Sequence, residues 1–151
     1  MIPNVEAGTR EAGRDVSEID IMAAPIIVTG RTAAELEEER KLLKRRVSFY
    51  ASTRTYSPVF EVHGWGEIGE RLHQLSLENR WDDMVKLIPD EMAEAFGTVA
   101  PIEEIGPRLR ERWSGILTSL NFPTDFPLDA PEDEKRTREI VQLLQSDTSS
   151  P

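Results

Sequence analysis

The alternation of apolar and polar positions along the chain predicts a mostly helical protein with two strands. Residues 19–29, IDIMAAPIIVT, are nearly continuous in apolar side chains, as in a strand that is buried on both faces. Pro25 lacks a backbone N–H group, so we expect a sheet edge or a bulge at that point. Residues 115–122, GILTSLNF, are expected to form the second strand.

Helical periodicity begins directly after the first strand. Thr32 and Glu35 form a capping box, in which each side chain bonds to the backbone of the other residue. The helix that follows is expected to run to about Ala51. Its predicted buried stripe consists of Leu36, Leu43, Val47 and Tyr50. Before the strand, Gly13 is expected to end a helix whose last part is residues 5–12.

The second half of the chain contains several short helical patterns. Ser57-Pro58 and Asp82 are predicted to cap the starts of two helices. Gly64, Pro89 and Gly97 are predicted to end helices. We also expect a kink at Gly106-Pro107. The expected helices after the Ser57 helix are residues 67–79, 83–88, 90–96, 101–113 and 132–145, the last of them reached through a loop marked by Pro123, Pro127 and Pro131.

Composition narrows the possible functions. The 18 Lys and Arg residues face 28 Asp and Glu residues, which gives a net charge of −10. An acidic protein repels phosphate backbones, so we expect no nucleic-acid partner. The chain has no cysteine, which removes disulfides and thiolate chemistry, and no apolar run approaches the roughly 20 residues of a membrane span. The N-terminus lacks the pattern of a signal peptide, so we expect a cytoplasmic protein.

Residues 49–66, FYASTRTYSPVFEVHGWG, differ from the Glu-, Leu- and Arg-rich text on either side. They contain both tyrosines, one of the two histidines, and small hydroxyl side chains among the aromatic ones. Such a mixture is typical of segments that border a ligand site. The alternative is a packed loop whose aromatic side chains fill a gap, and the sequence leaves both interpretations open.

The motifs of common catalytic sites are absent or lack the right context. Residues 64–69, GWGEIG, fit the dinucleotide pattern G-x-G-x-x-G, but Ser57-Pro58 indicates a helix before them where that motif needs a strand. The two histidines, His63 and His73, have no third ligand at a zinc spacing, so no metal site is expected. No serine lies in a nucleophile elbow.

One series of segments resembles the luciferase-like monooxygenase superfamily, and within it the branch of oxidoreductases that use the deazaflavin coenzyme F-420. The resemblance extends over about residues 2–113. It rests on EAGTREAGRD at 6–15, the strand end IVTG with RTAAE at 27–35, FYAST at 49–53, Tyr56, HGW at 63–65, RWDDM at 80–84 and DEM at 90–92.

The resemblance implies an α/β fold, the C-terminal portion of a (β/α)8 TIM barrel. The two predicted strands become its seventh and eighth strands and lie parallel as neighbours. A whole barrel needs about 250 residues, so six strands are missing and the chain is expected to be truncated or one half of a split gene. We expect residues 1–122 to form the barrel part and residues 123–151 to form a loop, a final helix and a polar tail.

The implied parent reaction is hydride transfer between the deazaflavin, or alternatively flavin mononucleotide, and a small organic substrate. The resemblance places most cofactor contacts on the missing strands, so this chain alone is not expected to hold the cofactor tightly. Candidate residues for the mouth of the barrel are Tyr50, Ser52, Thr53 and Trp65, with His63 as a candidate proton donor. We expect self-association or a partner chain that supplies the missing strands. The alternative is a non-catalytic helical protein that docks to a partner.

Overall fold

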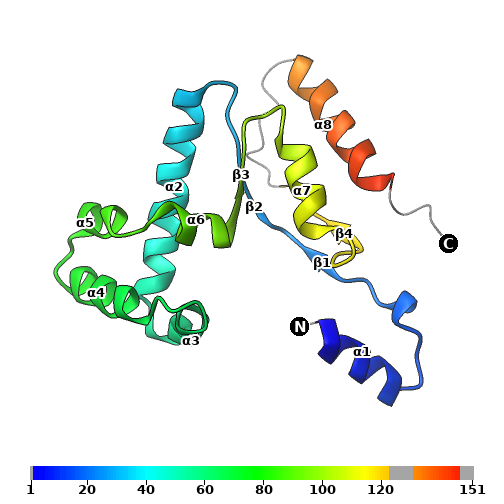
Figure 1. Ribbon diagram of the computed structural model, residues 1–151, viewed down its shortest axis with the longest axis horizontal. Coiled ribbons are helices and arrows are strands. Elements are labelled where there is room, and N and C mark those ends of the chain that lie inside the picture. Colours follow the sequence, from blue (N-terminus) through cyan, green and yellow to red (C-terminus); the bar gives the residue numbers. More distant parts are fainter. Residues whose placement is uncertain (1, 123–130, 147–151) are drawn as a thin grey trace. The chain divides into compact units, whose positions relative to one another are not determined.

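The computed structural model describes residues 2–122 and 131–146, and the chain forms two compact units (Figure 1). Unit 1 contains the residues up to Ile27 and those from Gly106 onward, and unit 2 contains residues 28–105. This grouping joins segments from both ends of the chain. The predicted division into a barrel part, residues 1–122, and a C-terminal extension, residues 123–151, is not a division into compact units. It stays a prediction.

Unit 1 contains a parallel pair of short strands. β1 (Met22–Ala23) lies beside β4 (Ser119–Leu120), with Met22 opposite Ser119. The backbone N–H of Asn121 extends this ladder by donating to the carbonyl of Ala23 at 2.9 Å. The expected parallel contact between the two strand regions is therefore confirmed.

Both strand regions are shorter than predicted. Residues 19–29 form two strands, β1 and β2 (Ile26–Val28), because Pro25 offers no N–H group between them. A 3-10 turn, η1 (Val16–Glu18), precedes β1. In the second region Gly115 has a φ of +71°, a conformation that belongs to a turn, so the ladder there is confined to β4.

The helices of unit 1 are α1 (Ile2–Glu11), α7 (Ile105–Trp113, which begins at the unit boundary) and α8 (Pro131–Gln145). The prediction of α8 is confirmed. The prediction of a kink at Gly106-Pro107 is wrong, because the helix starts only at Ile105. Pro107 then lies in the first turn, where a missing N–H group breaks no helical hydrogen bond. Pro123 and Pro127 lie outside the described residues.

Unit 2 is built on α2 (Ala33–Ser52), against which α4 (Gly66–Leu77), α5 (Trp81–Lys86) and α6 (Asp90–Phe96) pack. Leu43 and Val47 of α2 are buried as predicted, together with Ala51 one turn later. Tyr50 is 41% exposed, so its place in the buried stripe is wrong. Position 50 faces away because the buried stripe passes through Val47 and Ala51.

Two short elements join α2 to α4, the 3-10 turn η2 (Arg54–Tyr56) and α3 (Ser57–Glu61). The helix at α3 excludes the strand that a dinucleotide-binding loop needs before Gly64. α5 begins at Trp81 with Arg80 at its N-cap, so the prediction that Asp82 caps this helix is wrong. Asp82 instead lies in the first turn, where a negative charge also favours the helix dipole.

Unit 2 also contains a strand that the sequence did not reveal, β3 (Gly97–Val99), which pairs with β2. The N–H groups of Ala100 and Ile102 donate to the carbonyls of Val28 and Gly30, each at 3.1 Å. The residue numbers of the bonded partners rise in the same direction along both strands, so the two strands are parallel. Gly97 was expected only to stop a helix, and a three-residue strand leaves no periodicity to detect.

The fold class is therefore α/β, mostly helical with few parallel strands. Within residues 2–122 and 131–146, no helix combines the length and the apolar character that a bilayer crossing requires.

Candidate functional site

The turn between β2 and α2 is closed by Thr32 and Glu35 as predicted, except that Glu35 bonds to the backbone N–H of Arg31, one residue before Thr32. The backbone N–H of Glu35 donates to the Thr32 hydroxyl at 3.1 Å, and the N–H of Arg31 donates to the Glu35 carboxylate at 2.8 Å. Gly30 makes the turn possible, because a Cβ atom there would overlap the backbone nitrogen of Leu36 and lie 2.9 Å from its Cα. The close approach is between two parts of the backbone.

This helix start does not fit a phosphate group. Helix N-termini bind phosphate through free N–H groups and a positive dipole, and in barrels the loops after the seventh and eighth strands often do so. Here the N–H groups of Arg31 and Glu35 already have side-chain acceptors, and the Glu35 carboxylate places a negative charge at this position. The two occupied N–H groups and the added carboxylate disfavour a phosphate at this turn.

The pair of strands β2 and β3 does contain polar groups that suit an uncharged ligand. The hydroxyl oxygens of Thr29 and Thr98 are buried and have no hydrogen-bond partner among the residues that the structure describes. The two residues are 6% and 5% exposed. Burying a hydroxyl without a partner costs about 1–3 kcal/mol, so two such groups in one small sheet need an explanation.

The register of β2 and β3 places these two hydroxyls on one face. In a parallel ladder, the bonds from Ala100 to Val28 and from Ile102 to Gly30 set Thr29 opposite Ala100. Thr98 is two residues before Ala100 and so shares its face. Thr29 directly follows the last residue of β2, which is the carboxyl end of this strand. Ligands of parallel α/β proteins bind at such ends.

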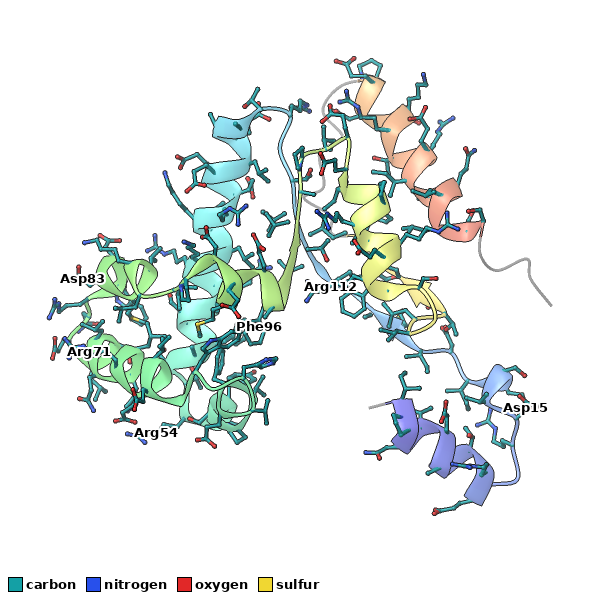
Figure 2. The ribbon with its side chains drawn as sticks, in the orientation of Figure 1. Asp15, Arg54, Arg71, Asp83, Phe96 and Arg112 are labelled. Carbon is teal, nitrogen blue, oxygen red and sulfur yellow. The ribbon has the colours of Figure 1, made fainter. Side chains whose placement is uncertain are left out.

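The two aromatic candidates His63 and Trp65 lie together. Their rings stack with centroids 4.8 Å apart and an interplanar angle of 17°. Both rings also contact Phe96, each with a centroid distance of 6.3 Å. Figure 2 shows Phe96 at the end of α6, and the next residue, Gly97, begins β3. This cluster is therefore near the amino end of β3, while Thr29 marks the carboxyl end of β2.

The remaining candidates are divided between surface and interior. Tyr50 contacts the rings of Phe49 and Tyr56, at centroid distances of 5.8 and 5.2 Å, in an exposed aromatic group. Ser52 is buried, and its hydroxyl donates to the carbonyl of Phe49 at 2.8 Å. The Thr53 hydroxyl donates to the same carbonyl at 3.1 Å. Both hydroxyls are thus used inside the last turn of α2.

The sequence reasoning missed a polar group around His73. The ring Nδ1 of His73 lies 2.9 Å from the Ser52 carbonyl, and its Nε2 lies 3.2 Å from the Nε of Arg54. Because Arg54 can only donate, Nε2 accepts and the proton is on Nδ1. Arg54 also pairs with Glu70 at 3.4 Å, and these side chains border a small pocket of about 120 Å³. The sequence offered no signal for this group, because Arg54 and His73 are 19 residues apart and belong to different elements.

The described residues provide no metal site. Among residues 2–122 and 131–146, no three His, Asp or Glu side chains are placed to hold an ion. The Lys44 and Arg40 side chains of α2 pair with Asp90 and Glu94 of α6, respectively. The hydrogen bond from Lys44, at 2.6 Å, lowers the pKa of Asp90. These charges join two helices of unit 2.

Comparison with known proteins shows one family. A family model described as luciferase-like monooxygenase matches residues 1–120. The chain is 36% identical over 116 residues to the uncharacterized protein Rv1360 of Mycobacterium tuberculosis (strain ATCC 25618 / H37Rv) and to the uncharacterized protein Mb1395 of Mycobacterium bovis (strain ATCC BAA-935 / AF2122/97). These matches cover 77% of this chain and 34% of each relative, so the chain spans about a third of the relatives' length.

Proposed function

Because the chain belongs to the luciferase-like monooxygenase family, we propose that it serves an oxidoreductase that acts on an organic substrate with a flavin or deazaflavin cofactor. Such a cofactor supplies hydride transfer. The coenzyme F-420 branch is the more specific form of the proposal, and flavin mononucleotide is its alternative. The residues of this chain bind and orient the uncharged part of the ligand.

The observation that supports this role is the pair of unpartnered hydroxyls at Thr29 and Thr98. They lie on one face of two parallel strands, and Thr29 is at a carboxyl end. A ring carbonyl or ring nitrogen of a ligand accepts hydrogen bonds from such donors and so removes the cost of their burial. For this reason the proposed site is placed at Thr29 rather than at His63 and Trp65.

The same site holds no phosphate, since the start of α2 is occupied by Thr32 and Glu35. We therefore propose that the chain by itself binds the cofactor weakly and contacts only its ring system. Tight binding in the working enzyme then needs barrel strands beyond the two pairs seen here, from a partner chain or from a second copy.

A titration with two flavins tests this proposal. Flavin fluorescence anisotropy is measured as the purified chain is added to riboflavin and, separately, to flavin mononucleotide, which differ by one phosphate. We expect dissociation constants weaker than micromolar and equal for the two ligands within a factor of two. Binding of either flavin at micromolar affinity or better, or clearly tighter binding of flavin mononucleotide than of riboflavin, would contradict the weak, ring-only site.

Matched variants distinguish the two threonine hydroxyls from the aromatic cluster of His63 and Trp65. Thr29→Val and Thr98→Val remove a hydroxyl at nearly constant shape, and each is expected to weaken riboflavin binding about fivefold, the effect of one hydrogen bond. Thr55→Val, at an exposed position of η2, is the control and should bind like the original chain. If Trp65→Phe weakens binding and both threonine variants do not, the ligand is at the aromatic cluster.

A second candidate function is docking to a partner protein without catalysis. The exposed group of Phe49, Tyr50 and Tyr56 favours it, because contiguous aromatic surface is enriched at protein interfaces. This candidate predicts no flavin binding by any variant. The flavin titration therefore also distinguishes the two functions.

A further inference from the structure

We propose that unit 1 contains a separate binding site for a small neutral organic molecule that has an apolar body and one hydrogen-bond acceptor. The site is a pocket of about 360 Å³ bordered by α7, β4 and α8. This volume is within the range of about 300–1,000 Å³ that is usual for small-molecule sites. The pocket shares no residue with the flavin site proposed above, so the two proposals stand independently.

The walls of the pocket are mostly apolar and come from three elements. Leu109 and Trp113 belong to α7, Leu120 to β4, and Val141 and Leu144 to α8. Leu109 is fully buried, whereas the other four side chains are only half-buried. They retain accessible apolar surface along a common hollow, and an apolar ligand gains free energy by covering that surface.

Trp113 provides one polar group of the pocket, which is also lined by Arg110, Ser114, Thr118, Ser119 and Gln145. Its indole N–H group is buried, and no acceptor for it exists within the part of the chain that the structure describes. The guanidinium of Arg112 lies over the indole ring, 5.3 Å from the centroid, and burial lowers the pKa of this arginine. One face of the ring is thus covered, and Figure 2 shows Arg112 on α7. A ligand whose acceptor reaches this buried N–H group would supply its missing partner.

The chemistry of the ligand follows from this donor and these walls. An indole N–H group donates one hydrogen bond and accepts none, so it selects a carbonyl, ether or hydroxyl oxygen. The half-buried aliphatic side chains favour a hydrocarbon body. Arg110, which also lines the pocket, already has an interaction of its own. The structure therefore assigns a neutral ligand, such as a ketone, to this pocket.

Two isosteric probes test the acceptor directly. Acetophenone has a carbonyl group where α-methylstyrene has a methylene group, and the two molecules are otherwise closely alike. The full chain is labelled with 15N-tryptophan, which gives one indole N–H signal for each of Trp65, Trp81 and Trp113. We expect acetophenone to shift the Trp113 signal downfield and to bind about fivefold more tightly than α-methylstyrene, the effect of one hydrogen bond.

Two variants complete the test. Trp113→Phe retains an aromatic wall and removes the donor, so the fivefold preference for the ketone should disappear while the hydrocarbon still binds. Trp81→Phe, in unit 2, should leave both affinities unchanged. If neither probe binds, the proposed site is wrong. If Trp113→Phe keeps the preference for the ketone, the proposed role of the indole is wrong. If Trp113→Phe fails to fold, the shift of the Trp113 signal in the original chain decides: no shift at saturating acetophenone overturns the proposal.

Discussion

The hydroxyl group of Thr118 donates a hydrogen bond to the carboxylate of Asp20, which is 98 residues earlier in the chain. The backbone N–H of Thr118 donates in turn to the carbonyl of Ile21 at 3.0 Å. These bonds lie beside the parallel pair of β1 and β4. They connect the two segments of the chain that make up unit 1.

This contact makes a prediction about proton affinity. The hydroxyl of Thr118 and, to a lesser degree, that of Ser119 lower the pKa of Asp20. Thr118→Val removes the larger contribution, so the pKa of Asp20 should rise toward its ordinary value. NMR titration of the side-chain carboxyl measures it. Asp15, whose pKa is lowered by Ser17, is the internal control and should not change. An unchanged pKa of Asp20 would show that the bond does not persist in solution.

The lowered pKa of Asp20 also sets the direction of a pH effect on stability. A carboxyl group that is more acidic in the folded state than in the unfolded state stabilises the fold above the unfolded-state pKa. That contribution is lost as the pH falls through the acid range toward the lowered value. The difference in unfolding midpoint between the original chain and Thr118→Val should therefore shrink as the pH is lowered below about 4, the ordinary range of an aspartate.

The capping box of α2 gives a second prediction. Thr32→Ala removes the acceptor of the Glu35 N–H group, and loss of one N-cap typically costs about 1 kcal/mol of unfolding free energy. Urea denaturation followed by circular dichroism measures the change. Thr55→Ala removes an exposed threonine hydroxyl that is not at a helix start, and it should change the free energy by less than about 0.5 kcal/mol. Equal effects of the two substitutions would contradict the cap.

The capping box also shows which parts of the fold a sequence can reveal. Thr32 and Glu35 act on backbone groups within four residues, so their spacing alone identified the helix start. The helix end at Gly13 was equally local, and its φ of +65° is the left-handed conformation expected there. The strand break at Pro25 belongs to the same class, although its consequence, two strands in place of one, was not foreseen.

The features that were missed depend on distant partners. β3 is three residues long and exists because its N–H groups reach Val28 and Gly30. Tyr50 has the spacing of a buried residue, yet the helices that pack on α2 cover a different stripe. The site residues show the same limit. Aromatic composition indicated residues 49–66, whereas the unpartnered hydroxyls of Thr29 and Thr98 become visible only once two strands are paired.

The turn at Gly30 gives a third prediction. Gly30→Ala places a Cβ atom against the backbone of Leu36, which no rotamer change relieves. We expect a loss of at least about 2 kcal/mol of unfolding free energy, as in other overpacked sites. Gly8→Ala is the matched control, because its Cβ would meet nothing within 4 Å inside α1. It should stabilise the chain by about 0.5–1 kcal/mol through helix propensity. Urea denaturation of both variants measures this, and a tolerated Gly30→Ala would contradict the tight turn.

The free strand edges of unit 1 give the last prediction. Within the described residues β1 and β4 pair only with each other, and Met22 of β1 is 59% exposed. Open edges with apolar side chains promote association. We expect the isolated chain to self-associate or to bind a hydrophobic dye at micromolar concentration, as measured by analytical ultracentrifugation and dye fluorescence. Met22→Lys should weaken both effects, because an edge lysine opposes strand pairing. Leu77→Lys, at a 67% exposed position of α4, should not. A compact monomer without dye binding would contradict the hypothesis that the chain is a portion of a barrel. It would favour a self-contained docking protein, because natural selection would have made the surface of such a protein polar.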